Sequence, residues 1–172
     1  MNANACPVRV TLQVAVDATD ALPDVLVFGK WVNAALNASG AGLPDSACVT
    51  IRIVSSAESS ELNSSYRDVQ QSTNVLAFPV DAYPIPEGVN DDVELGDIVI
   101  CYEVAVQEAE EQQTDVAAHF AHLAVHGSLH LVGYDHMNNT EAVVMESLER
   151  QVLEAMGFDN PYKNDDRGLR EA

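Results

Sequence analysis

The segment HFAHLAVHGSLHLVGYDHM, residues 119–137, contains all five histidines of the 172-residue chain. Within it, His126 and His130 are followed by Gly133 and His136, which gives the pattern HxxxHxxGxxH. Residues four apart lie one above the other on a helix, so His126 and His130 can present their imidazoles to one metal ion. Gly133 can adopt the positive φ that ends a helix, and the following turn lets His136 supply a third nitrogen. The pattern predicts a helix that ends at Gly133 and carries a zinc site.

Three histidine ligands are typical of a catalytic zinc site rather than a structural one. They leave one tetrahedral position for a water, whose pKa falls to about 7 on the metal. We therefore expect one Zn²⁺ per chain. The expected reactive group is a zinc-bound water held by His126, His130 and His136.

The spacing leaves two alternatives open. The four histidines before Gly133, including His119, share one stripe of the helix, so His122 and His126 could be the ligand pair instead. The turn from Gly133 to His136 favours the later pair. The histidines could also lie on a helix face without binding metal, with their ring nitrogens hydrogen-bonded to carbonyl groups or solvent.

Gly127 bears on the choice between hydrolase classes. In metzincin proteases, which have the same histidine spacing, the residue after the first histidine is a glutamate that acts as general base. Here that residue is Gly127, so a peptidase would lack its base at the expected place. Asp135 could orient a ligand histidine or complete the turn. Ser128 has no dedicated base and receives no role, and the general base stays unassigned.

The charge of the chain restricts its partners. It has 8 basic and 27 acidic residues and a net charge of -19, which disfavours a generic nucleic-acid binder held only by phosphate contacts. No Lys or Arg occurs between Arg67 and Arg150, so the candidate cations near the histidines are Arg9, Arg52 and Arg67. Arg67 could anchor a phosphate through its planar guanidinium, or it could be a solvated arginine at the end of a helix.

Hydrophobic periodicity predicts an α+β or α/β protein with one sheet, and we expect the α+β class with a single mixed sheet. Period-two or short apolar runs predict about four strands, at residues 8–16, 49–53, 73–78 and 95–101. Helical spacing with capping and stop signals predicts about five helices, at residues 23–38, 55–66, 102–113, 115–132 and 138–156. Residues 79–94, rich in Pro and acids, are expected to form a functional flap or a mobile loop.

The predicted domain spans residues 1–157, and residues 158–172 form a polar tail that we expect to be frayed. The chain has no long apolar run and no signal-peptide pattern, so we expect a cytoplasmic protein without a membrane partner. The cysteines, which are odd in number and widely spaced, predict no disulfide framework and no thiolate zinc site.

Four blocks of sequence resemble the YbeY family of bacterial endoribonucleases, which are rRNA maturation factors. The most specific is HGSLHLVGYDH at 126–136; the others are ELNSSYR with TNVLAFP within 61–79, LGDIVI at 95–100 and GFDNPY at 157–162. The resemblance covers nearly the whole chain. It implies a YbeY-like, metal-dependent hydrolase fold with about four strands and about five helices.

The resemblance further implies a zinc-dependent, single-strand-specific endoribonuclease that acts in 16S ribosomal RNA maturation and ribosome quality control. Its zinc ligands would be His126, His130 and His136, and its functionally important arginine would be Arg67. The expected partners are single-stranded and ribosomal RNA, the small ribosomal subunit and assembly factors, but not DNA. The alternatives are a zinc metallopeptidase and a non-catalytic ribosome-assembly factor.

Overall fold

In the computed structural model, the described residues are 8–17, 22–44, 46–67, 73–80, 93–135 and 137–162, with the side chains of Tyr66 and Arg67 excepted. Most of the loop expected at 79–94 therefore lies outside the described residues. Within the described ranges, no helix has the length and apolar character that a membrane crossing requires.

The strands form one mixed sheet, as predicted. Its strands are β1 (Arg9–Val14), β2 (Ala47–Val54), β3 (Val75–Pro79) and β4 (Val93–Cys101), in the order β1-β2-β4-β3. β2 pairs in parallel with both β1 and β4, whereas β3 pairs antiparallel with β4. The helices are α1 (Val25–Ser39), α2 (Ser56–Arg67), α3 (Tyr102–Glu111), α4 (Val116–Leu131) and α5 (Asn139–Ala155). The predicted α+β class is confirmed.

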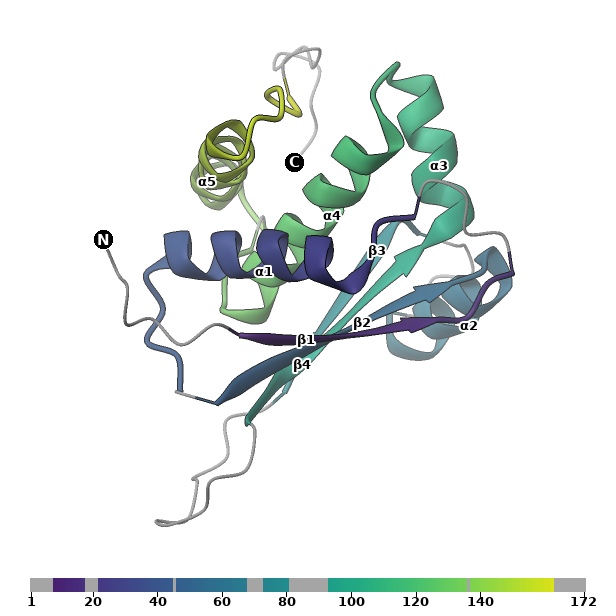
Figure 1. The fold of residues 1–172 in the computed structure, drawn as a ribbon, viewed down its shortest axis with the longest axis horizontal. Helices are drawn as coiled ribbons and strands as arrows, with labels where there is room; N and C mark the ends of the chain where they lie inside the picture. Colours follow the sequence, from purple (N-terminus) through teal and green to yellow (C-terminus); the bar gives the residue numbers. More distant parts are fainter. Residues whose placement is uncertain are drawn as a thin grey trace.

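The two faces of the sheet are covered by different helices. In Figure 1, α1 and α4 lie over one face and α2 lies on the other. Successive side chains of a strand point to opposite faces. Ile98 and Ile100 of β4 accordingly belong to the large core with α1 and α4, while Val99 packs on the other side with Leu62 of α2. The histidine helix α4 and the arginine at the end of α2 therefore start from opposite faces of the sheet.

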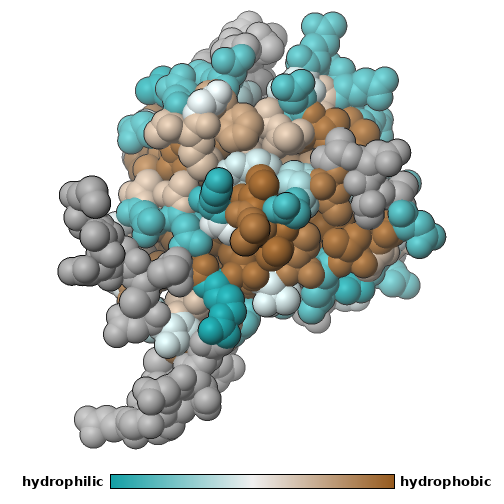
Figure 2. Space-filling view, in the orientation of Figure 1, coloured by the Kyte–Doolittle hydropathy of each residue, from teal (hydrophilic) through white to brown (hydrophobic). Residues whose placement is uncertain are grey.

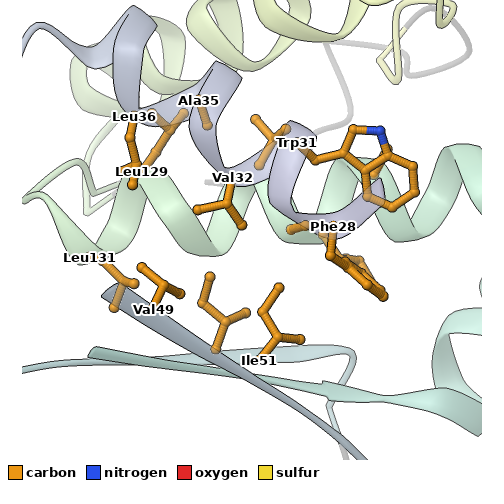
Figure 3. Close-up of a cluster of buried hydrophobic side chains, with 14 of the residues drawn as sticks. Phe28, Trp31, Val32, Ala35, Leu36, Val49, Ile51, Leu129 and Leu131 are labelled. Atoms are coloured by element: carbon orange, nitrogen blue, oxygen red, sulfur yellow. The ribbon is translucent and has the colours of Figure 1, made fainter. Parts of the chain in front are cut away.

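Helix α1 fixes α4 against the sheet. Its fully or nearly fully buried residues recur at helical spacing, and they are Phe28, Trp31, Val32, Ala35 and Leu36. Figure 3 shows them together with Val49 and Ile51 of β2 and Leu129 and Leu131 of α4. Because these side chains are almost completely buried and closely packed, a shift of α4 along the sheet would open the core.

The outer side of α1 is less polar than the net charge of -19 suggests. Figure 2 shows apolar residues exposed on this face of the molecule. By exposed fraction, Val25 of α1 is 38% exposed and Leu26 of α1 is 75% exposed.

Gly127 lets α4 approach β4 closely. A Cβ built on Gly127 would lie 2.8 Å from Cγ2 of Ile98, a side chain with 0% exposure. We predict that Gly127→Ala destabilises the fold by about 1–3 kcal/mol, since the core must shift to accept one methyl group. The measurement is thermal or denaturant unfolding of the purified variant.

Gly29 provides the matched control for this prediction. It is also a helical glycine, but a Cβ built there meets no heavy atom within 4 Å. Gly29→Ala should therefore leave stability unchanged or raise it by up to about 1 kcal/mol, because alanine favours a helix. Equal destabilisation by the two substitutions would show that close packing on Ile98 is not the cause.

Ser55 and Glu58 have the spacing of a capping box at the start of α2, but only half of the box is formed. The Ser55 hydroxyl accepts from Glu58 N at 3.2 Å, as expected for an N-cap. The Glu58 carboxylate, however, does not return to the cap. It binds Arg52 of β2 through two bonds, of 2.6 and 3.0 Å. A charge-assisted bidentate pair is stronger than a bond to one backbone N–H, and it also occupies Arg52, one of the candidate cations.

The first residues of the expected tail are packed rather than frayed. Phe158 makes an edge contact with Trp31, with ring centroids 6.0 Å apart. Tyr162 is only 7% exposed. Gly157 has a φ of 93°, so the chain reverses after α5 and returns along it. The expectation of fraying therefore fails for residues 158–162, and residues 163–172 lie outside the described residues.

Candidate metal centre and its groove

The chain after α4 makes the positive-φ turn that Gly133 predicts. Gly133 has a φ of 103°, and its N–H donates to the carbonyl of His130 at 3.1 Å. Tyr134 N donates to the carbonyl of Leu129 at 3.1 Å. The Tyr134 hydroxyl then donates to the carbonyl of Ser39, at the end of α1, at 3.0 Å. The turn after the helix is therefore anchored to the core, which fixes the direction in which the chain leaves His130.

His126 and His130 converge on one point. Their Nε2 atoms are 3.0 Å apart, and their ring centroids are 4.6 Å apart. Two nitrogens that bind one zinc at about 2.0–2.1 Å must lie within about 4 Å of each other. The pair meets this condition, and both rings lie on the partly exposed side of α4. The two nitrogens therefore fit a shared metal ion.

A buried glutamate of α5 holds His126. Glu149 is 0% exposed, and its Oε2 lies 2.8 Å from Nδ1 of His126. Its Oε1 lies 2.8 Å from Nε2 of His122 and accepts a hydrogen bond from the Tyr162 hydroxyl at 2.5 Å. Burial acts to raise the pKa of the Glu149 carboxyl, but the hydrogen bonds and charges of His122 and His126 outweigh it and hold the pKa well below its usual range.

The charge of Glu149 determines where the proton of His126 lies. An ionised carboxylate only accepts hydrogen bonds, so Nδ1 of His126 must carry the proton in this contact. In the neutral imidazole, Nε2 then keeps its lone pair on the side that faces His130. A metal ligand needs that lone pair, and an accompanying carboxylate is the usual way to orient it.

His119 and His122 have other partners. His119 is 4% exposed, and its Nε2 lies 2.8 Å from Oε1 of Glu108. Glu108 also accepts from the Asn74 amide at 3.0 Å. Burial acts to raise the pKa of Glu108, but its hydrogen bonds from His119 and Asn74 prevail and lower it. The rings of His122 and His126 are farther apart, at 6.3 Å, and Nε2 of His122 is bound to Glu149. This geometry favours the later histidine pair over the earlier one.

Two predicted site residues are not placed by the structure. His136 lies outside the described residues, and only the backbone of Arg67 is described, as the last residue of α2. In the part of the chain that is described, no group of three or more His, Cys, Asp or Glu forms a complete metal site. The third ligand and the phosphate anchor therefore stay predictions.

Two further residues of α4 are unsuited to catalysis in the described structure. Ser128 has 0% exposure, and its hydroxyl donates to the carbonyl of Ala124 at 2.7 Å, so it faces the core. Gly127 faces Ile98 of the sheet. Gly127 carries no side chain, so the carboxylate base that a metzincin-like peptidase has directly after its first ligand histidine is missing from that position. Asp135 is exposed in the turn.

A groove of about 870 Å³ adjoins the metal centre. It runs from the end of α3 along the histidine stripe to residues 157–162 of the C-terminal segment. His119, His122 and His126 line it together with Phe158 and Tyr162. A substrate in this groove would lie beside His126.

Sequence reasoning did not find Glu149 or Tyr162. A signal for Glu149 was present, because it lies on the stripe of α5 that contains the buried residues Met145, Val152 and Leu153. An ionisable residue at a core position of a helix is rare unless it is paired. Tyr162 gave a weaker signal, since it is one of two aromatic residues, with Phe158, in the polar segment 158–172.

Two comparisons place the chain among known proteins. A sequence model of the family described as Endoribonuclease YbeY matches residues 17–157. TM1509 from Thermotoga maritima, known from a solution structure, is similar with a TM-score of 0.50 and 22% identity, over 94% of this chain and 99% of that one. That identity supports a common fold alone. The family match includes the histidine helix, the end of α2 and Glu149, and the chain belongs to the endoribonuclease YbeY family.

Proposed function

We propose that this endoribonuclease depends on zinc and cuts single-stranded RNA, and that it acts in the cytoplasm on small-subunit ribosomal RNA during maturation and quality control of the ribosome. The observation that supports zinc is the convergence of Nε2 of His126 and Nε2 of His130, 3.0 Å apart. The proposed ligands are these two residues and His136, with one ion per chain. When bound, zinc supplies a water of lowered pKa and a Lewis acid for the phosphate oxygens.

The protein residues divide the remaining work. Glu149 keeps the Nε2 lone pair of His126 directed at the metal position. The groove along His119, His122 and His126 receives the RNA strand. Arg67 is proposed to bind the scissile phosphate, because its planar guanidinium can donate two parallel hydrogen bonds to the oxygens.

The acidity of the chain supports local rather than broad contact with RNA. A net charge of -19 repels phosphates over most of the surface. The described lining of the groove also carries four acids, Glu108, Glu111, Asp115 and Asp159, and no Lys or Arg. A short single strand would therefore rely on the proposed metal and on Arg67, whereas a long duplex would meet the acidic surface along its length. We therefore propose that the small subunit and assembly factors present the RNA to the groove.

The proposal is tested by cleavage assays on matched substrates. We expect cutting of a single-stranded ribosomal RNA fragment, much slower cutting of the same sequence as a duplex, and no cutting of casein. A chelator should abolish cleavage, and added Zn²⁺ should restore it. Full RNA cleavage in the presence of the chelator would refute the proposed zinc dependence. Cleavage of casein without cleavage of RNA would refute the proposal that RNA is the substrate.

A further inference from the structure

We infer that Glu149 and Tyr162 are positioning residues of the metal centre: Tyr162 holds the Glu149 carboxylate, which in turn fixes the orientation of His126. The C-terminal segment at residues 157–162 then belongs to the site and is not an appendage of the domain. The inference rests on the proposed function, since it takes His126 to be a metal ligand.

The fold alone does not account for a carboxylate at position 149. Glu149 is fully buried on the stripe of α5 that packs into the core with Met145 and Val152. Taking a charge out of water is costly, and well-packed apolar residues at such a position are often as stabilising or more so. Three close donors compensate the charge here, from His122, His126 and Tyr162. Two of them are histidines of α4, so the carboxylate connects α5 to the histidine stripe.

The C-terminal segment is arranged to bring the Tyr162 hydroxyl to Glu149. Phe158 N donates to the carbonyl of Leu153 at 2.9 Å, which closes the end of α5. The Phe158 ring lies against Trp31 of α1. The Asn160 side chain accepts from Tyr162 N at 2.9 Å. These contacts fix the backbone on both sides of the turn, so the tyrosine ring enters the core in one direction.

Tyr162 and His122 together determine which oxygen remains for His126. Both bind Oε1 of Glu149, and the Tyr162 ring also contacts the His122 ring edge-on at 5.2 Å. With Oε1 held by two donors, the carboxylate plane is fixed and Oε2 accepts from Nδ1 of His126. Loss of the tyrosine hydroxyl removes one of those two donors. Loss of the carboxylate charge removes the preference of His126 for the Nδ1–H tautomer.

The test compares zinc affinity in three variants of the full chain. Glu149→Gln keeps the size of the side chain but loses its charge, and Tyr162→Phe loses only the hydroxyl. Glu108→Gln is the matched control, because Glu108 makes a bond of the same 2.8 Å to another histidine of α4, His119. Zn²⁺ affinity is measured by competition with a chelator of known affinity, and melting temperature is recorded for each protein.

We expect Glu149→Gln to weaken zinc binding about 10–100-fold, as for other partners of ligand histidines. Tyr162→Phe should cause a smaller loss in the same direction, and Glu108→Gln should bind zinc like the wild type. The tautomer of His126, read from nitrogen chemical shifts of the metal-free protein, should be Nδ1–H in the wild type and in Glu108→Gln. It should be mixed or Nε2–H in Glu149→Gln.

The outcomes separate this inference from the proposed function. A wild type that binds no zinc overturns both. A wild type that binds zinc, with a folded Glu149→Gln variant of equal affinity and unchanged tautomer, overturns the inference alone. If Glu149→Gln does not fold, Tyr162→Phe decides, and unchanged zinc affinity in that variant contradicts the role of the tyrosine. An equal loss in Glu108→Gln would also contradict the inference, because it would show a general effect on α4.

Discussion

Replacing His130 with Ala should yield a folded protein that no longer binds zinc stoichiometrically and no longer cuts RNA. His130 is partly exposed, and its Nε2 contacts Nε2 of His126 on the partly exposed side of α4. The cost in stability should therefore stay within about 1 kcal/mol. Removal of one of the three proposed nitrogen ligands would leave the ion without a complete site. Zinc content by elemental analysis, circular dichroism and RNA cleavage together measure the effect.

His119→Ala is the matched control for His130→Ala. His119 lies on the same stripe of α4, but it pairs with Glu108 rather than with Glu149 or His126. The control should keep its zinc, although it loses some stability because its ring is buried. Zinc retained in His130→Ala, or lost in His119→Ala while the fold persists, would show that the metal does not bind at His126 and His130.

Replacing Arg67 with Ala should lower RNA cleavage by about a hundredfold or more while zinc content and melting temperature stay close to wild type. A guanidinium that binds the scissile phosphate stabilises charge that develops in the transition state, and its loss acts on the rate. An arginine that is only a solvated cation at the end of α2 would contribute at most about 1 kcal/mol to stability and nothing to cleavage. Single-turnover cleavage of a single-stranded RNA separates these two roles.

Two variants sharpen the test of Arg67. Arg67→Lys keeps the positive charge but cannot donate two parallel hydrogen bonds, so its rate of RNA cleavage should lie between those of Arg67→Ala and the wild type. Arg150→Ala is the control for a general loss of positive charge. Arg150 lies on α5, 49% exposed at its side chain, and interacts at 3.8 Å with Glu154. Cleavage by Arg67→Ala at the wild-type rate, under conditions where His130→Ala is inactive, would refute the proposed role.

Local sequence patterns predict the core of the site well. The four-residue spacing of His126 and His130 and the stop at Gly133 follow from helix geometry alone, and both features are present. The period-two and helical patterns likewise predict the mixed sheet and its surrounding helices. In each case the residues that determine the local structure are close in sequence. The repeat distance of a helix or a strand is therefore enough to predict it.

The contacts that depend on packing could not be predicted in this way. Glu149 meets His126 only because α5 packs on α4, and its choice of partner follows from the relative placement of two helices. Glu58 shows the same limit, because Arg52 of the neighbouring strand competes successfully for its carboxylate. Tyr162 is buried because the chain reverses at Gly157, so a polar composition around it did not indicate disorder.

We propose above all that RNA cleavage depends on a zinc ion that His126 and His130 would hold. The most direct measurement prepares the metal-free protein, adds Zn²⁺ in steps and records the initial rate of single-stranded RNA cleavage at each measured zinc content. The account predicts a rate that rises in proportion to bound zinc and levels off at about one ion per chain, with no rise in the His130→Ala variant. A rate that does not depend on zinc content, or that rises equally in His130→Ala, would contradict it.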